Sequence, residues 1–152
     1  PADRVTLDLW GDLDADPAYV EQIRQRSDPQ VVRLRGRFAE ADRDRVLADL
    51  DLLLVPSIGL ESFGIVAREA MAVGVPVIAS TAGALAELPL EGCGALVPPD
   101  DVAALRGWVE ALVADPERVD EWAARIRPPL SMADHATAVE ALYAALLEGR
   151  TP

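Results

Sequence analysis

The chain has 152 residues, of which 51% are hydrophobic and 26% charged, so it is long enough to bury a core and too apolar to be disordered. Its net charge of −12 argues against a nucleic-acid partner, because binding a phosphate backbone needs a basic face. No apolar run reaches the roughly 18 residues of a membrane span, and no basic and apolar leader precedes Val5. We expect one cytoplasmic domain over residues 1–152, with no membrane association indicated.

The residue usage indicates a bacterial source. All 14 basic residues are arginine, which together with the abundant alanine is typical of a high-GC bacterial gene. A single cysteine, Cys93, cannot form an internal disulfide and fits a reducing cytosol. The chain begins with Pro1 and enters a strand-like run within a few residues. We therefore expect it to be a piece of something longer.

Strand-like and helix-like patterns alternate along the chain. Strands are predicted at residues 4–10, 31–35, 52–55, 75–79 and 95–97. The most continuous of these runs have the composition of parallel strands that are buried on both faces. Strands alternating with helices imply right-handed crossovers and a Rossmann-like, doubly wound parallel sheet of the α/β class. We expect the five strands to form one sheet.

Capping signals predict where the helices begin. Asp16-Pro17 and Asp115-Pro116 each combine an N-cap with a proline at the first helical position, and Asp100 or Asp101 caps the helix before Asp115. Pro128-Pro129 stop the helix that Asp115-Pro116 open. Helices are predicted over residues 17–26, 42–49, 63–73, 83–88, 101–114 and 134–147. Gly149 is expected to terminate the last of them.

Residues 52–79 hold the candidate site. They place Glu61 and Glu69 on either side of a glycine-containing helix start, between two buried strands. Ligands of open parallel sheets bind beyond the carboxyl ends of the strands, where a helix N-terminus offers free N–H groups to a phosphate. We expect Glu61 in the loop, Glu69 on the helix and Ser62 near its N-cap. On spacing alone, two solvated charges flanking a helix remain the alternative.

The motif PSxxxESFGxxxxEAMAxGxPVIAS, followed by AGALAEL and GALVPPDD, carries a resemblance. It resembles the C-terminal, donor-binding domain of retaining family-4 glycosyltransferases of the GT-B architecture, most densely over residues 31–114. The resemblance implies transfer of a sugar from a nucleoside-diphosphate sugar to an acceptor hydroxyl, with no metal or other cofactor. It also implies that the first strand of the domain, a basic pair for the diphosphate and the N-terminal acceptor domain all precede this chain.

The resemblance also implies roles for single residues. The glutamate matching Glu69 holds the ribose hydroxyls, and the one matching Glu61 lies beside the donor sugar, so Glu61 is the residue expected at the reacting centre, as a positioning group and not an acid or base. Residues at the helix start are expected to face the diphosphate or the sugar, namely Ser62, Phe63, Gly64, Ile65 and Val66.

Two further loops match the family's donor site. Arg37 and Phe38 follow the second strand, where the family contacts the nucleobase; an ordinary turn is the alternative there. Gly83 belongs to a loop that usually carries a double glycine, and the departure to AGALAE leaves its phosphate role open. Ser57 is expected to shape its loop, since no G-x-S-x-G elbow surrounds it.

Alternatives to a transferase stay open. One histidine and one cysteine far apart cannot supply a metal site, and His135 is expected to be structural or solvent-facing. A nucleotide-sugar epimerase of the same fold and a non-catalytic nucleotide-sugar-binding module are the competing functions. We expect the isolated chain to fold and to transfer no sugar.

Overall fold

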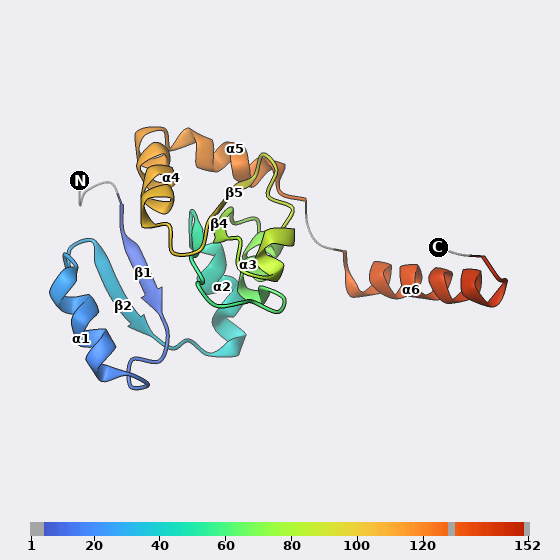
Figure 1. Cartoon of the computed structure of the whole chain (residues 1–152), viewed down its shortest axis with the longest axis horizontal. Coiled ribbons are helices and arrows are strands. Elements are labelled where there is room, and N and C mark those ends of the chain that lie inside the picture. The colour runs from blue at the N-terminus through green and yellow to red at the C-terminus, as the bar shows by residue number, and fades with distance from the viewer. Residues whose placement is uncertain (1–4, 128–129, 151–152) are drawn as a thin grey trace.

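The computed structural model describes residues 5–127 and 130–150, in which strands and helices alternate (Figure 1). The elements are β1 (Leu7–Trp10), α1 (Pro17–Arg26), β2 (Val32–Gly36), η1 (Glu40–Asp42), α2 (Arg43–Ala48), β3 (Leu53–Val55), α3 (Ile65–Ala72), β4 (Val77–Ser80), η2 (Ala84–Glu87), β5 (Gly94–Val97), α4 (Val102–Ala114), α5 (Glu117–Arg125) and α6 (Met132–Leu147). This confirms the α/β class and the positions of the strands. Arg4, predicted to begin the first strand, and the helix stop at Pro128-Pro129 lie outside the described residues.

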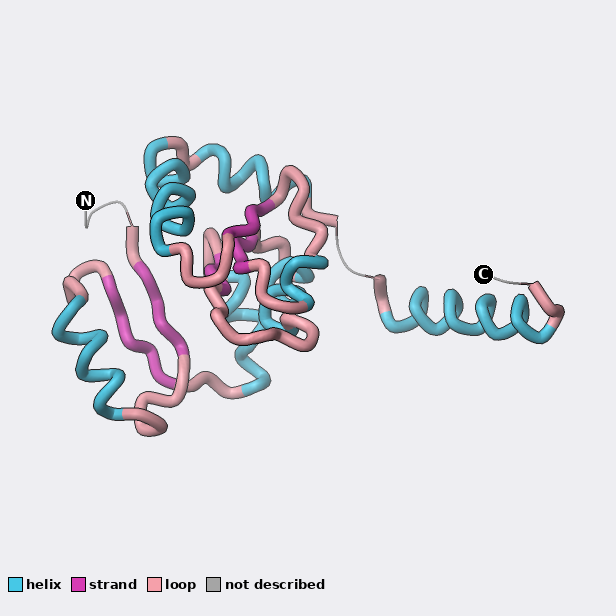
Figure 2. Tube along the Cα trace, viewed as in Figure 1, coloured by secondary structure: helices cyan, strands magenta, loops and turns pink. Residues whose placement is uncertain are grey.

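The described strands form two parallel sheets, so the prediction of one continuous sheet was wrong (Figure 2). β1 pairs with β2, and β4 lies between β3 and β5. Among the described residues, no strand pairing joins the two sheets. That the first strand of the domain precedes this segment stays a prediction.

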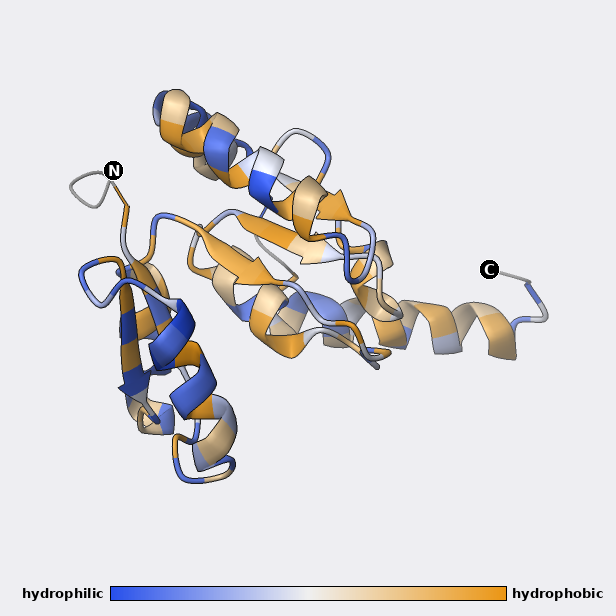
Figure 3. Cartoon of the chain, turned by 60° about the vertical axis from the view of Figure 1, so that its left-hand side comes forward, coloured by the Kyte–Doolittle hydropathy of each residue, from blue (hydrophilic) through white to orange (hydrophobic). Residues whose placement is uncertain are grey.

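The core lies on both faces of β4, whose Val77, Ile78 and Ala79 are fully buried. One face packs against α2 and α3 through Leu47, Ala70 and other apolar side chains. The opposite face packs against α4 and α5 through residues Leu112 and Trp122. Figure 3 shows this apolar three-stranded sheet between its helices. Helices on both faces are what the alternating pattern predicts for parallel strands.

The aspartate signals place two helix starts correctly. Asp16 accepts a hydrogen bond from the Tyr19 N–H at 3.0 Å, and Asp101 accepts one from the Ala104 N–H at 2.8 Å. The predicted cap at Asp115 was wrong: Asp115 ends α4, and Pro116 is the N-cap of α5 without a side-chain bond.

The start of α3 also differs from the prediction. The helix begins at Ile65 rather than at residue 63, and its N-cap is Gly64 in the left-handed conformation (φ +69°, ψ +49°), without a side-chain cap. Ser62 is therefore not the cap. A side chain at position 64 would place its Cβ 2.6 Å from Cδ2 of the buried Leu85 in η2, and the positive φ at this position favours glycine as well.

The last helix, α6, extends away from the sheets (Figure 1). It begins at Met132, two residues before the predicted start, because Ser131 caps it by accepting from the Asp134 N–H at 3.1 Å. His135 is exposed in its first turn, as expected. In the part of the chain that the structure describes, no helix combines the length and apolarity that crossing a membrane needs.

Candidate functional site

Two loops meet beyond the carboxyl ends of β3 and β4. The backbone of Glu61, in the loop after β3, forms a parallel bridge with Gly83, in the loop after β4. The Ala84 N–H donates to the Glu61 carbonyl at 2.9 Å, and the Glu61 N–H donates to the Ala82 carbonyl at 3.4 Å. This junction fixes Glu61 and Gly83 against each other at the edge where doubly wound sheets bind ligands.

One serine bonds the side chain of Glu61, and a second serine bonds the backbone of the first. The Ser57 hydroxyl donates to Glu61 Oε1 at 2.9 Å. The Ser80 hydroxyl, at the buried end of β4, donates to the Ser57 carbonyl at 2.6 Å. Sequence reasoning gave Ser57 a role in loop shape only and did not consider Ser80. The signal for Ser80 was a polar residue closing the apolar strand VIAS.

The first turn of α3 begins beside this junction. An α-helix leaves the N–H groups of its first residues without acceptors inside the helix, here those of Ile65, Val66 and Ala67. The Arg68 N–H is the first to bond back, to the Gly64 carbonyl at 3.2 Å. Relative to the prediction, Phe63 lies ahead of the helix. Ala67 is fully buried, so the accessible N–H groups of this turn are those of Ile65 and Val66. The helix dipole adds partial positive charge at this end.

Glu69 lies on α3, about one turn after Ile65, and its place on the helix agrees with the prediction. Its Oε1 pairs with Nη1 of Arg43 at 2.9 Å. Arg43 is the first residue of α2, which packs beside α3. Sequence reasoning did not identify Arg43, because nothing in the local sequence connects it with Glu69.

Arg37 and Phe38 lie beside the end of β1 and the loop that follows it. Arg37 forms an ion pair with Asp12, and the Phe38 ring meets Trp10 edge to face with centroids 5.4 Å apart. The pKa of the Asp12 carboxyl is lowered. The larger cause is the hydrogen bond that it accepts from the Asp14 N–H, and the next is its interaction with Arg37. Among the described interactions, none joins Arg37 or Phe38 to the two glutamates. The nucleobase role of this loop stays a prediction.

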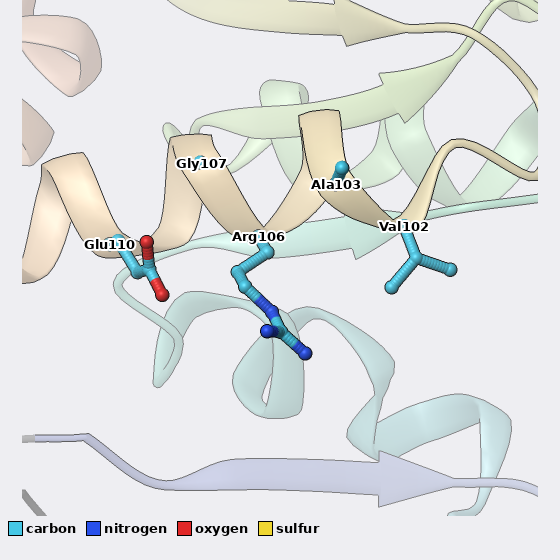
Figure 4. Close-up of a pocket in the computed structure, with 5 residues that line it drawn as sticks. All are labelled: Val102, Ala103, Arg106, Gly107 and Glu110. Carbon is cyan, nitrogen blue, oxygen red and sulfur yellow. The ribbon is translucent and has the colours of Figure 1, made fainter.

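Two hollows of the described surface do not enclose the two glutamates. One hollow, of about 370 Å³, is lined by residues of α4 alone, including Arg106 and Glu110 (Figure 4). Another, of about 100 Å³, lies at the ends of β3, β4 and β5 and includes Ser80 in its wall. The candidate site is thus an open edge of the sheet. Among the described residues, no group of three or more His, Cys, Asp or Glu side chains could hold a metal ion.

Comparison with known proteins identifies the family to which the chain belongs. The family model described as "Glycosyl transferases group 1" matches residues 1–127, and the chain belongs to this family. It is 41% identical over 97 residues to a phosphatidyl-myo-inositol mannosyltransferase of Mycobacterium leprae, a match that covers 62% of this chain and 25% of that protein. Two parallel sheets with flanking helices are thus the fold of a GT-B glycosyltransferase segment.

Solved structures agree with this assignment. Anabaena Alr3699/HepE in complex with UDP-glucose matches with a TM-score of 0.67 and 29% identity over 80% of this chain and 35% of that one. Sucrose-phosphate synthase from Thermosynechococcus elongatus matches with a TM-score of 0.73 and 26% identity over 96% of this chain and 39% of that one. The curated relatives are much longer proteins, of which this chain spans about a quarter to a third.

Proposed function

We propose that this chain is the donor-binding half of a retaining glycosyltransferase, which moves a sugar from a nucleoside-diphosphate sugar to an acceptor hydroxyl. The observation that carries the proposal is the junction of Glu61 and Gly83 beside the start of α3. It brings a carboxylate, a close backbone approach and unpaired helical N–H groups to one edge of a parallel sheet. The complexes of HepE with UDP and UDP-glucose support a nucleotide sugar as the ligand class.

Each group has a role that its chemistry supports. Glu69 accepts from the ribose hydroxyls, and Glu61 accepts from hydroxyls of the donor sugar. A hydrogen bond to a charged group contributes about 1.5–3 kcal/mol. The N–H groups at the start of α3 face the diphosphate. When the bond to the sugar breaks, negative charge grows on that diphosphate, and N–H groups already in place stabilise it.

The proposal assigns the rest of the machinery to other parts of a longer protein. An acceptor-binding domain and the basic pair for the diphosphate are expected ahead of this segment. No described residue is assigned as a nucleophile, and Glu61 positions the sugar. The isolated chain therefore binds nucleotide sugar at high-micromolar concentration or more weakly.

The test uses the full-length protein and the isolated chain side by side. Calorimetric titration with UDP-glucose, GDP-mannose and ADP-glucose identifies the donor, and NMR of the glycosylated product gives the anomeric configuration. We expect transfer with retention by the full-length protein and none by the isolated chain. Epimerisation of the sugar without an acceptor, binding without turnover, or an inverted product would each contradict the proposal. So would transfer by the isolated chain.

A further inference from the structure

The ion pair between Arg43 and Glu69 joins two helices at the candidate site. Arg43 Nη1 lies 2.9 Å from Glu69 Oε1, and the two side chains are 36% and 26% exposed. This pair is less open to solvent than pairs such as Arg45 with Asp49, whose side chains are 66% and 74% exposed. A partly buried pair is screened less by salt and holds its geometry better than an exposed one.

The pair leaves one carboxylate oxygen of Glu69 for other donors. A carboxylate has about four acceptor positions on its two oxygens. Arg43 Nη1 forms an ion pair with Oε1, while its Nε donates to Asp44 Oδ1 at 3.3 Å, so the guanidinium is itself held in place beside the carboxylate. No interaction among the described residues uses Oε2. The Glu69 side chain is 26% exposed, so the carboxylate group is partly open to solvent and to a ligand. A glutamate held in this way has already lost rotamer freedom before a ligand arrives.

The place of Arg43 in the chain adds a second connection. Arg43 is reached from β2 through the loop of Arg37 and Phe38 and the short helix η1. The segment proposed to meet the nucleobase therefore continues directly into the residue that holds the proposed ribose acceptor. Arg45, two residues further into α2, pairs with Asp42 and Asp49 instead, and no ion pair among the described residues joins it to α3.

We propose that Arg43 is a positioning residue that holds Glu69 toward the ribose and thereby makes the site select ribonucleotides over 2′-deoxyribonucleotides. The inference rests on the proposed function, in which Glu69 binds the ribose hydroxyls. Arg43 itself does not contact the nucleotide. Its effect appears as discrimination between two ligands that differ in one hydroxyl.

The test measures that discrimination in the full-length protein. UDP, GDP and ADP are titrated by calorimetry together with their 2′-deoxy forms, and the ratio of the two dissociation constants is taken for the base that binds. We expect a ratio of about 10 to 100 for the wild type, the loss of one charge-assisted hydrogen bond. In Arg43→Gln the ratio falls to about 3 or less. Arg43→Lys keeps an intermediate ratio, since an ammonium donates without the planar fork of arginine.

Arg45→Gln is the matched control on the same helix and keeps the wild-type ratio. Thermal melting of each variant separates a folding defect from a change in selectivity. If Arg43→Gln does not fold, a ratio in Arg43→Lys below that of the wild type supports the inference, and an unchanged ratio overturns it. A wild-type ratio in folded Arg43→Gln, or equal loss of affinity for both nucleotides, also overturns it.

The outcomes separate the inference from the function on which it rests. A wild-type protein that binds none of the three nucleoside diphosphates overturns both. If the ratio of dissociation constants falls toward 1 in Glu69→Ala but keeps its wild-type value in Arg43→Gln, the ribose role of Glu69 stands. Only the role of Arg43 is then overturned.

Discussion

A Cβ atom added to Gly83 would lie 2.3 Å from the carbonyl oxygen of Glu61. Gly83 also has φ +62° and ψ −134°, a conformation that residues with a side chain rarely adopt. The loops after β3 and β4 thus touch through their backbones at this point. Glycine is required at position 83 for Glu61 to be held where it is.

Gly83→Ala should therefore destabilise the protein and displace Glu61. We expect a loss of about 2–4 kcal/mol in the free energy of unfolding, from backbone strain and the clash together. Urea denaturation measures it. Gly59→Ala is the control, because a Cβ there meets nothing within 4 Å. Similar losses in the two variants would show that the junction is not the cause.

Ser62, which does not cap α3, and Asp101, which caps α4, should differ in what they contribute to stability. Ser62 makes no cap bond because Gly64 occupies the N-cap, so Ser62→Ala should change stability by less than about 0.5 kcal/mol. Asp101→Ala removes a real cap of α4 and should cost about 1 kcal/mol. Urea denaturation curves of the two variants measure both changes in the free energy of unfolding. A loss of 1 kcal/mol in Ser62→Ala would place the cap at residue 62.

Burial makes Cys93 an unreactive thiol. Its Sγ lies 3.3 Å from the Pro89 carbonyl, the residue is 3% exposed, and burial raises the pKa of the thiol. Because the thiolate is the reactive form, a raised pKa leaves less of it at any pH below that pKa. We expect slow modification by a disulfide reagent at pH 8 in the native protein and fast modification after unfolding in guanidinium chloride. Fast native modification would contradict the buried placement.

Local signals in the sequence were enough to place most elements. Apolar runs located the strands, and Asp16 and Asp101 marked two helix starts by chemistry that acts within three residues. Strand pairing was not readable, because it depends on which sheet edges meet far apart in the chain. The start of α3 was also missed, since Gly64 packs against the side chain of Leu85 in η2, which is distant in sequence.

In the candidate site, too, local sequence signals predicted the positions of residues but not their long-range contacts. The motif placed Glu61 on a loop and Glu69 on a helix, and both placements agree with the structure. It did not reveal what orients them. Ser80 bonds to a residue 23 positions away, and Arg43 reaches Glu69 across two helices, so neither contact leaves a local pattern.

The Ser57 hydroxyl provides a test of how Glu61 is oriented. Ser57→Ala removes the bond to Glu61 Oε1, so the carboxylate should hold the donor sugar less well. We expect turnover of the full-length enzyme to fall about 3- to 10-fold with unchanged affinity for the free nucleoside diphosphate. Ser57→Thr keeps the hydroxyl and should retain more activity. Turnover that is unaffected in Ser57→Ala would show that the bond has no part in catalysis.

The two glutamates should fail in different ways. Glu69→Ala in the full-length enzyme should weaken the free nucleoside diphosphate and the nucleotide sugar alike, by about 2–4 kcal/mol, because both ligands carry the ribose. Glu61→Ala should leave the free nucleoside diphosphate nearly unaffected and lower turnover with the sugar donor, because its partner is the sugar. Calorimetric titration of both variants with both ligands, together with turnover, separates the roles. Equal losses for the two ligands in Glu61→Ala, or undiminished nucleotide affinity in Glu69→Ala, would mean that the two carboxylates are wrongly assigned.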